Sequence, residues 1–107
     1  MNLDLSGKTA IVCGSTQGIG KATALQLAKM GANIILVARN EIKLASVKDE
    51  LDSSNGQKHN YIKTDFNFPA ELTSSIEGFI KKNGPAHILV NNTGGPPGGQ
   101  AIGAQTD

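Results

Sequence analysis

The sequence predicts an α/β protein in which a parallel sheet carries helices on both faces. Short apolar runs, typical of strands buried on both sides, alternate with longer runs whose apolar residues have helical spacing. A glycine-rich turn joins the first strand to the first helix. Such strand–helix–strand units cross over with a right hand, which makes the strands parallel. The predicted strands are residues 8–13, 33–38, 59–64 and 87–91.

The first predicted helix, residues 18–30, has Ala24, Leu25 and Ala28 on one face. Gly31 follows it and suits the left-handed position just past a helix end. After the second strand, Asn40 is expected to cap the next helix by accepting a backbone hydrogen bond.

The second predicted helix carries Leu44, Val47 and Leu51 at the spacing i, i+3, i+7 and ends before residues 53–56. Pro69 suits the first turn of a third helix. The apolar stripe of that helix consists of Leu72, Ile76, Phe79 and Ile80. Gly84 is expected to end the helix, ahead of the last strand.

For the nucleotide-binding version of this architecture, a Rossmann-type doubly wound parallel sheet, the strand order is 3-2-1-4. Its ligand lies beyond the carboxyl ends of strands one and four, where the order reverses. The segments that directly follow the strands are residues 14–20, Arg39, Asp65 and residues 91–94. We therefore expect them to line a single crevice.

The glycine-rich turn runs from Cys13 to Gly20 with the spacing G-x-x-x-G-x-G, whereas the usual dinucleotide fingerprint is G-x-G-x-x-G. Together with Asp65 after strand three and Asn91-Asn92-Thr93-Gly94 after strand four, it resembles the motifs of the short-chain dehydrogenase/reductase family. Among its members, the chain is most similar to 3-oxoacyl-acyl-carrier-protein reductases. Cys13 stands where the family has threonine, and Thr93 where it has alanine.

The resemblance implies roles for these residues. Gly14 would allow the tight turn, Gly18 would let the pyrophosphate approach, and Gly20 would let the helix pack on the sheet. The backbone of a glycine turn and a helix N-terminus can then hold phosphate. The other implied contacts are Ser15, Thr16, Gln17 and Ile19 in the turn, Asp65 and Phe66 at the adenine, and Asn92, Thr93 and Gly94 at the ribose.

Arg39 predicts NADP(H) rather than NAD(H) as the cofactor. An enzyme that selects NAD usually places a carboxylate at the end of strand two to bind the ribose 2′-hydroxyl. Here Arg39 occupies that end, and the first carboxylate after it is Glu41. A guanidinium matches a 2′-phosphate in shape and charge. Arg39 could instead be a solvated residue at a helix start.

The resemblance implies an oxidoreductase that transfers hydride between the nicotinamide and a carbonyl/alcohol pair. Its family uses a serine and Tyr-x-x-x-Lys, but the single tyrosine, Tyr61, is followed four residues later by Asp65. No catalytic residue can therefore be assigned. We expect residues 1–93 to be the NAD(P)-binding unit, and residues 94–107 to be a Gly/Pro-rich loop leading to a second half that carries catalysis and the substrate pocket.

Two other functions remain open: a non-catalytic dinucleotide-binding module, and a fragment that completes its sheet with a partner chain. Some residues also have structural readings. Asp65 could be a turn or cap residue before Pro69. Cys13 could be a buried small hydrophobe, or a thiol with a lowered pKa beside a helix N-terminus. His59 and His87 are expected to be surface or hydrogen-bonded histidines.

The composition excludes several classes of function. The 107 residues are 38% hydrophobic and 18% charged, as in a globular protein, and the net charge of +1 does not suggest nucleic-acid binding. We expect no membrane span and no signal peptide, because no apolar run is long enough. One cysteine forms neither an internal disulfide nor a zinc site. A cytoplasmic location is expected, with the full-length protein a homo-oligomer (dimer or tetramer), as in the family.

Overall fold

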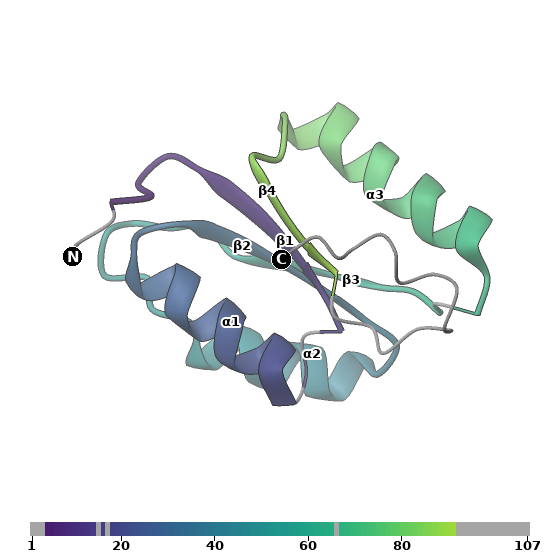
Figure 1. Ribbon diagram of the computed structural model, residues 1–107, viewed down its shortest axis with the longest axis horizontal. Helices are drawn as coiled ribbons and strands as arrows, with labels where there is room; N and C mark the ends of the chain where they lie inside the picture. Colours follow the sequence, from purple (N-terminus) through teal and green to yellow (C-terminus); the bar gives the residue numbers. More distant parts are fainter. Residues whose placement is uncertain (1–3, 15, 17, 66, 92–107) are drawn as a thin grey trace.

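The computed structural model describes residues 4–14, 16, 18–65 and 67–91. Strands and helices alternate along the chain, as the sequence predicts (Figure 1). The elements are β1 Thr9–Cys13, α1 Gly18–Lys29, β2 Asn33–Ala38, α2 Glu41–Glu50, β3 Asn60–Lys63, α3 Pro69–Asn83 and β4 Ile88–Asn91.

The four strands form one parallel sheet in the order β3-β2-β1-β4, which confirms the predicted doubly wound topology. The register aligns the carboxyl ends of the strands. Cys13 lies opposite both Val37 and Asn91, and Ala38 lies opposite Lys63. Residues that follow these strands therefore leave the sheet at the same edge.

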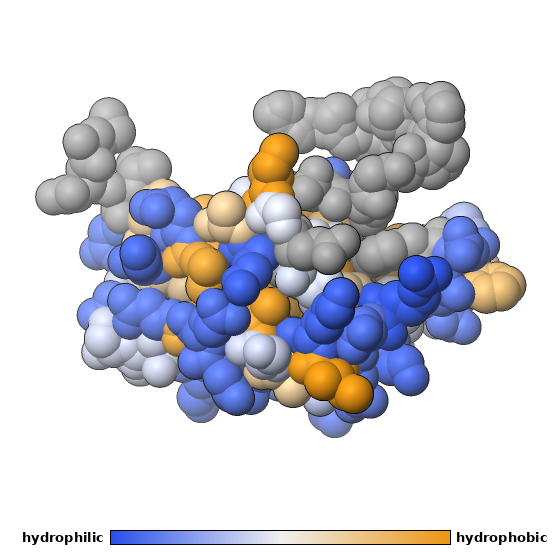
Figure 2. Space-filling view, turned by 90° about the horizontal axis from the view of Figure 1, so that it is seen from below, coloured by the Kyte–Doolittle hydropathy of each residue, from blue (hydrophilic) through white to orange (hydrophobic). Residues whose placement is uncertain are grey.

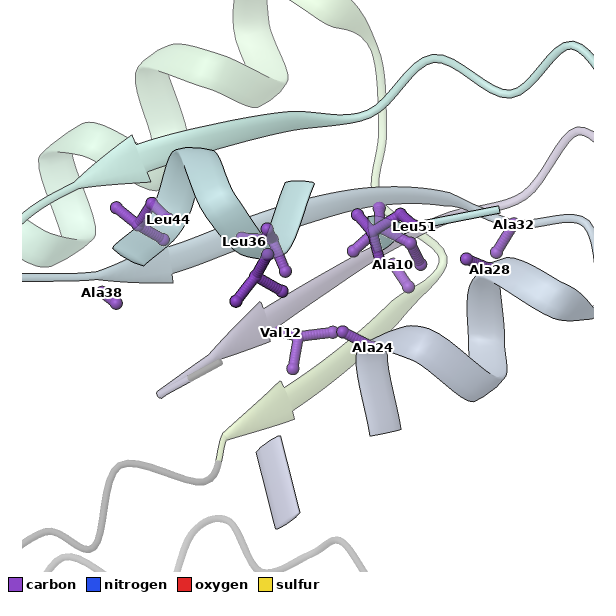
Figure 3. Packing of buried hydrophobic residues seen from close by; sticks show 11 residues of the cluster. Ala10, Val12, Ala24, Ala28, Ala32, Leu36, Ala38, Leu44 and Leu51 are labelled. Carbon is purple, nitrogen blue, oxygen red and sulfur yellow. The ribbon is translucent and has the colours of Figure 1, made fainter. Parts of the chain in front are cut away.

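Helices α1 and α2 cover one face of the sheet, and α3 covers the other (Figure 1). Between the sheet and the α1/α2 layer lies the larger apolar core, in which side chains from β1 and β2 meet small residues of α1 (Figure 3). Its buried members are Ala10, Val12, Ala24, Ala28, Ala32, Ile34, Leu36, Ala38, Leu44, Val47 and Leu51. The side of the molecule that carries α1 and α2 is largely hydrophilic, with separate apolar patches (Figure 2).

The α3 face is less completely covered. Its buried core consists of Ile11, Cys13, Ile35 and Val37, and the apolar stripe of α3 packs on it while remaining half-exposed. Among the described residues, β4 pairs with β1 alone, and Leu89 on β4 is 62% exposed. Within the described sheet, β4 is therefore an edge strand, and its Leu89 side chain is exposed.

The element ends differ from the sequence predictions by one or two residues. Leu51 is not part of α2: it is an extended C-cap residue, although its side chain is still buried. His59 and His87 precede β3 and β4 rather than beginning them. Nδ1 of His59 accepts the Ile34 N–H at 3.0 Å, and Nδ1 of His87 accepts the Thr9 N–H at 3.1 Å. Both are hydrogen-bonded histidines, as expected.

The glycine at the end of α1 is required by both its backbone and its surroundings. Gly31 has φ 102°, and a Cβ added there would lie 2.9 Å from Ser6 Oγ. We expect Gly31→Ala to lower the free energy of unfolding by about 2 kcal/mol, because a left-handed alanine is strained and also meets Ser6. Urea denaturation of both proteins measures this difference in the free energy of unfolding.

Gly56→Ala is the matched control for that substitution. Gly56 has φ 80°, but no atom in the described part of the chain lies within 4 Å of an added Cβ. It should therefore lose only the backbone part of the free energy, about 1 kcal/mol. Equal losses at both positions would contradict the role given to Ser6.

Candidate cofactor-binding site

The carboxyl edge of the sheet brings together the described part of the predicted site. Backbone pairing continues one residue past the strands, since the Gly14 N–H donates to Val37 O at 2.8 Å and the Thr64 N–H donates to Ala38 O at 2.9 Å. Gly14, Arg39 and Asp65 thus follow three aligned strand ends, and Asn91 ends the fourth. The remaining predicted positions Ser15, Gln17, Phe66, Asn92, Thr93 and Gly94 lie outside the described residues.

The glycine turn has the backbone geometry that its sequence predicts. Gly14 has φ 75° and Gly18 has φ 62°, a left-handed conformation that favours glycine. Gly18 is exposed at the start of α1, and a Cβ added there would meet none of the described residues within 4 Å. The backbone at Gly18 is therefore open to a close ligand, next to the positive end of the helix dipole.

The other described residues of the turn, Thr16, Ile19 and Gly20, differ in how far they are buried. Gly20 is buried within α1, which agrees with a packing role for it. Ile19 is 75% exposed and Thr16 is half-buried, so neither belongs to the apolar core. Contact of Ile19 with a ligand stays a prediction.

Arg39 lies exposed between the buried strand β2 and the first turn of α2. The cap predicted for this helix is confirmed: Oδ1 of Asn40 accepts the Lys43 N–H at 3.0 Å. Among the described residues the sole ion pair joins Lys21 and Glu50, at 3.1 Å between α1 and α2. No described carboxylate therefore pairs with Arg39, which leaves its guanidinium able to bind a phosphate.

Asp65 reaches the predicted edge and also forms a turn. Its Oδ1 accepts the Asn67 N–H at 2.9 Å, and its carbonyl oxygen accepts the Phe68 N–H at 3.0 Å. This turn leads directly into α3, so the structural interpretation of Asp65 has support. Contact with an adenine remains a prediction.

Cys13 is buried, which confirms the first of its two interpretations, a small residue of the apolar core. Burial raises the pKa of the Cys13 thiol to about 11. The alternative, a thiol with a lowered pKa, is wrong for this structure, because burial in the core below α3 disfavours the charged thiolate.

Two side-chain contacts near the strand ends have no signal in the sequence. Thr64, a buried polar residue directly after β3, donates from Oγ1 to Glu71 Oε1 of α3 at 3.3 Å. Tyr61 on β3 donates its hydroxyl to Glu41 Oε2 at the start of α2, at 3.1 Å. The second contact joins residues twenty positions apart. It depends on how α2 and β3 pack together, which spacing alone does not predict.

Within the described ranges, no helix is long and apolar enough to span a membrane. The same part of the chain contains no cluster of three side chains suited to holding a metal ion. The features at the strand ends are thus a glycine turn, a guanidinium and polar loop residues, which suit an anionic organic ligand.

Known proteins share this arrangement. A family model described as short chain dehydrogenase matches residues 8–106. L-sorbose reductase from Gluconobacter frateurii, solved with NADPH and L-sorbose, superposes with a TM-score of 0.76 and 37% identity, over 86% of this chain and 35% of that one.

Of two proteins with similar sequences, one is named as a dehydrogenase and the other as inactive. L-rhamnose 1-dehydrogenase (NADP(+)) from Thermoplasma acidophilum is 40% identical over 86% of this chain and 36% of its own length. Human inactive hydroxysteroid dehydrogenase-like protein 1 is 41% identical over 82% of this chain and 26% of its own length. The chain therefore spans only part of the length of these relatives.

Proposed function

Because the chain belongs to the short-chain dehydrogenase family, we propose that it forms the NADP(H)-binding part of an oxidoreductase. The reaction is hydride transfer between the nicotinamide and a carbonyl/alcohol pair. The observation that carries the cofactor choice is Arg39, exposed at the end of β2 with no ion-pair partner among the described residues. Similarity to the NADP(+)-named dehydrogenase and to the reductase solved with NADPH supports it.

The residues of this chain bind and orient the cofactor. The open backbone at Gly18 and the first N–H groups of α1 hold the pyrophosphate. Arg39 binds the 2′-phosphate through paired, charge-assisted hydrogen bonds. Asp65 and Phe66 hold the adenine, while Ser15, Thr16, Gln17, Asn92, Thr93 and Gly94 complete the contacts. The bound cofactor supplies the hydride, and the protein supplies its position.

The acid/base group of the reaction is not among these residues. The sequence contains no Tyr-x-x-x-Lys, so the proposal requires that motif elsewhere in the whole protein. The same proposal for the whole protein includes a carbonyl or alcohol substrate bound by a second half to which residues 94–107 lead. It also includes homo-oligomerisation and a cytoplasmic location.

The activity is tested on the whole protein with NADPH and a panel of aliphatic, cyclic and sugar-derived carbonyl compounds. Loss of the reduced-nicotinamide absorbance that depends on both enzyme and carbonyl compound is expected. If NADPH binds but no member of the panel is reduced, and no alcohol is oxidised with NADP⁺, the assignment as an enzyme fails.

A non-catalytic dinucleotide-binding module is the second candidate. It is favoured by the similarity to a human protein whose name calls it inactive. Such a module predicts NADPH binding without turnover under every condition of the same assay. A chain that must complete its sheet with a partner predicts instead that it folds only when the partner is present.

A further inference from the structure

The ends of β2 and β3 carry a cluster of three exposed cations. Arg39 follows β2, Lys43 lies in the first turn of α2, and Lys63 is the last residue of β3, opposite Ala38 in register. None of the three forms an ion pair within the described part of the chain. This cluster creates a positive region where the proposed 2′-phosphate would sit.

Three carboxylates lie near these strand ends, and each accepts a hydrogen bond from a neutral donor. Glu71 accepts the Thr64 hydroxyl at 3.3 Å. Glu41 accepts the Tyr61 hydroxyl at 3.1 Å, and Asp65 accepts the Asn67 N–H at 2.9 Å. Glu41 is the only carboxylate between Arg39 and Lys43 in the sequence. The position of the Glu41 carboxylate therefore affects the electrostatic potential at the junction of β2 and α2.

The backbone of Tyr61 lies back from the ends of β2 and β3. Its register partner is Leu36, two residues before the pair formed by Ala38 and Lys63 at the strand ends. Two residues of strand correspond to about 6.6 Å. The ring of Tyr61 packs against the apolar core under α1 and α2, which limits where its hydroxyl can go. The hydrogen bond to the Glu41 carboxylate raises the pKa of the Tyr61 hydroxyl, which is a donor at neutral pH in any case.

We propose that Tyr61 and Glu41 form a positioning pair that strengthens selection of NADP(H) over NAD(H). The Tyr61 hydroxyl keeps the Glu41 carboxylate on the α2 side of the sheet, away from the phosphate that Arg39 binds. The inference rests on the proposed function and deepens it, because it adds a residue that controls the charge around Arg39.

The test uses Tyr61→Phe in the whole protein and measures dissociation constants for NADPH and NADH at low ionic strength, where charge effects are least screened. Freeing the carboxylate to approach the 2′-phosphate should weaken NADPH binding about threefold. NADH lacks that phosphate, so its affinity should stay unchanged. The melting temperature of the variant checks that the fold is kept.

Glu41→Gln provides the matched control, because it removes the charge and keeps an oxygen that can accept from Tyr61. NADPH should bind at least as tightly to this variant as to the wild type. Adding Tyr61→Phe to Glu41→Gln should then change nothing. A threefold loss that persists in the double variant would show that Tyr61 acts through packing and would overturn the proposal.

Other outcomes are equally decisive. An unchanged NADPH affinity in Tyr61→Phe, or an equal loss for NADPH and NADH, contradicts the positioning role while leaving the proposed function intact. A wild-type protein that binds NADPH no better than NADH contradicts the proposed cofactor itself, and this inference falls with it.

Discussion

Arg39→Asp should reverse the cofactor preference of the protein. The substitution removes the guanidinium that binds the 2′-phosphate and replaces it with a carboxylate that repels it. That carboxylate can also accept from the 2′-hydroxyl of NAD(H). We expect the ratio of the NADH to the NADPH dissociation constant to fall about 100-fold, which corresponds to about 2.7 kcal/mol. Fluorescence titration with both cofactors measures the ratio.

Lys8→Asp is the control for that charge reversal. Lys8 is also exposed, but it lies just before β1, at the amino end of the sheet and away from the proposed site. The net charge changes equally in both variants, so a general electrostatic effect would appear in both. An Arg39→Asp protein that still prefers NADPH would show that another group selects the phosphate.

Gly18→Val should abolish most dinucleotide binding with only a modest loss of stability. A β-branched residue is strained at φ 62°, and its side chain would occupy the open space beside the backbone. We expect both NADPH and NADH to bind at least about tenfold more weakly, because the pyrophosphate can no longer approach. The free energy of unfolding should fall by about 2 kcal/mol.

Gly56→Val separates the strain from the loss of binding. Gly56 has φ 80° and equally open surroundings, but it lies in the loop between α2 and β3. It should lose similar stability and keep its affinity for NADPH. If both valine variants bind NADPH like the wild type, the glycine turn is a connection without a ligand.

The fold could be predicted from the sequence because its signals are local. The apolar runs of β1 and β2 and the glycine turn between them leave few alternatives to a parallel sheet. Asn40 as a cap needs only its neighbours, and it is confirmed. Leu51 shows the limit of apolar spacing as a guide to helix ends. It continues the i, i+3, i+7 spacing of α2, but the helix ends before it. Its backbone is extended, and its side chain is nevertheless buried.

For the candidate site, the sequence could predict which residues lie at the carboxyl edge of the sheet, while their contacts with a cofactor stay predictions. Gly14, Arg39 and Asp65 reach the same edge because parallel register aligns them. The partners of Glu41 and Thr64 were not predicted, since each contact joins separate elements and depends on side-chain directions. The similarity to 3-oxoacyl-acyl-carrier-protein reductases stays a prediction, because the residues that would select an acyl substrate are not among those described.

Binding of NADPH and NADH to the wild-type protein tests the central claim most directly. Calorimetric titration of the whole protein with each cofactor gives both dissociation constants under one set of conditions. We predict that NADPH binds at least about tenfold more tightly, because Arg39 gains charge-assisted hydrogen bonds that NADH cannot offer. Equal or tighter binding of NADH, or no binding of either, would contradict the claim.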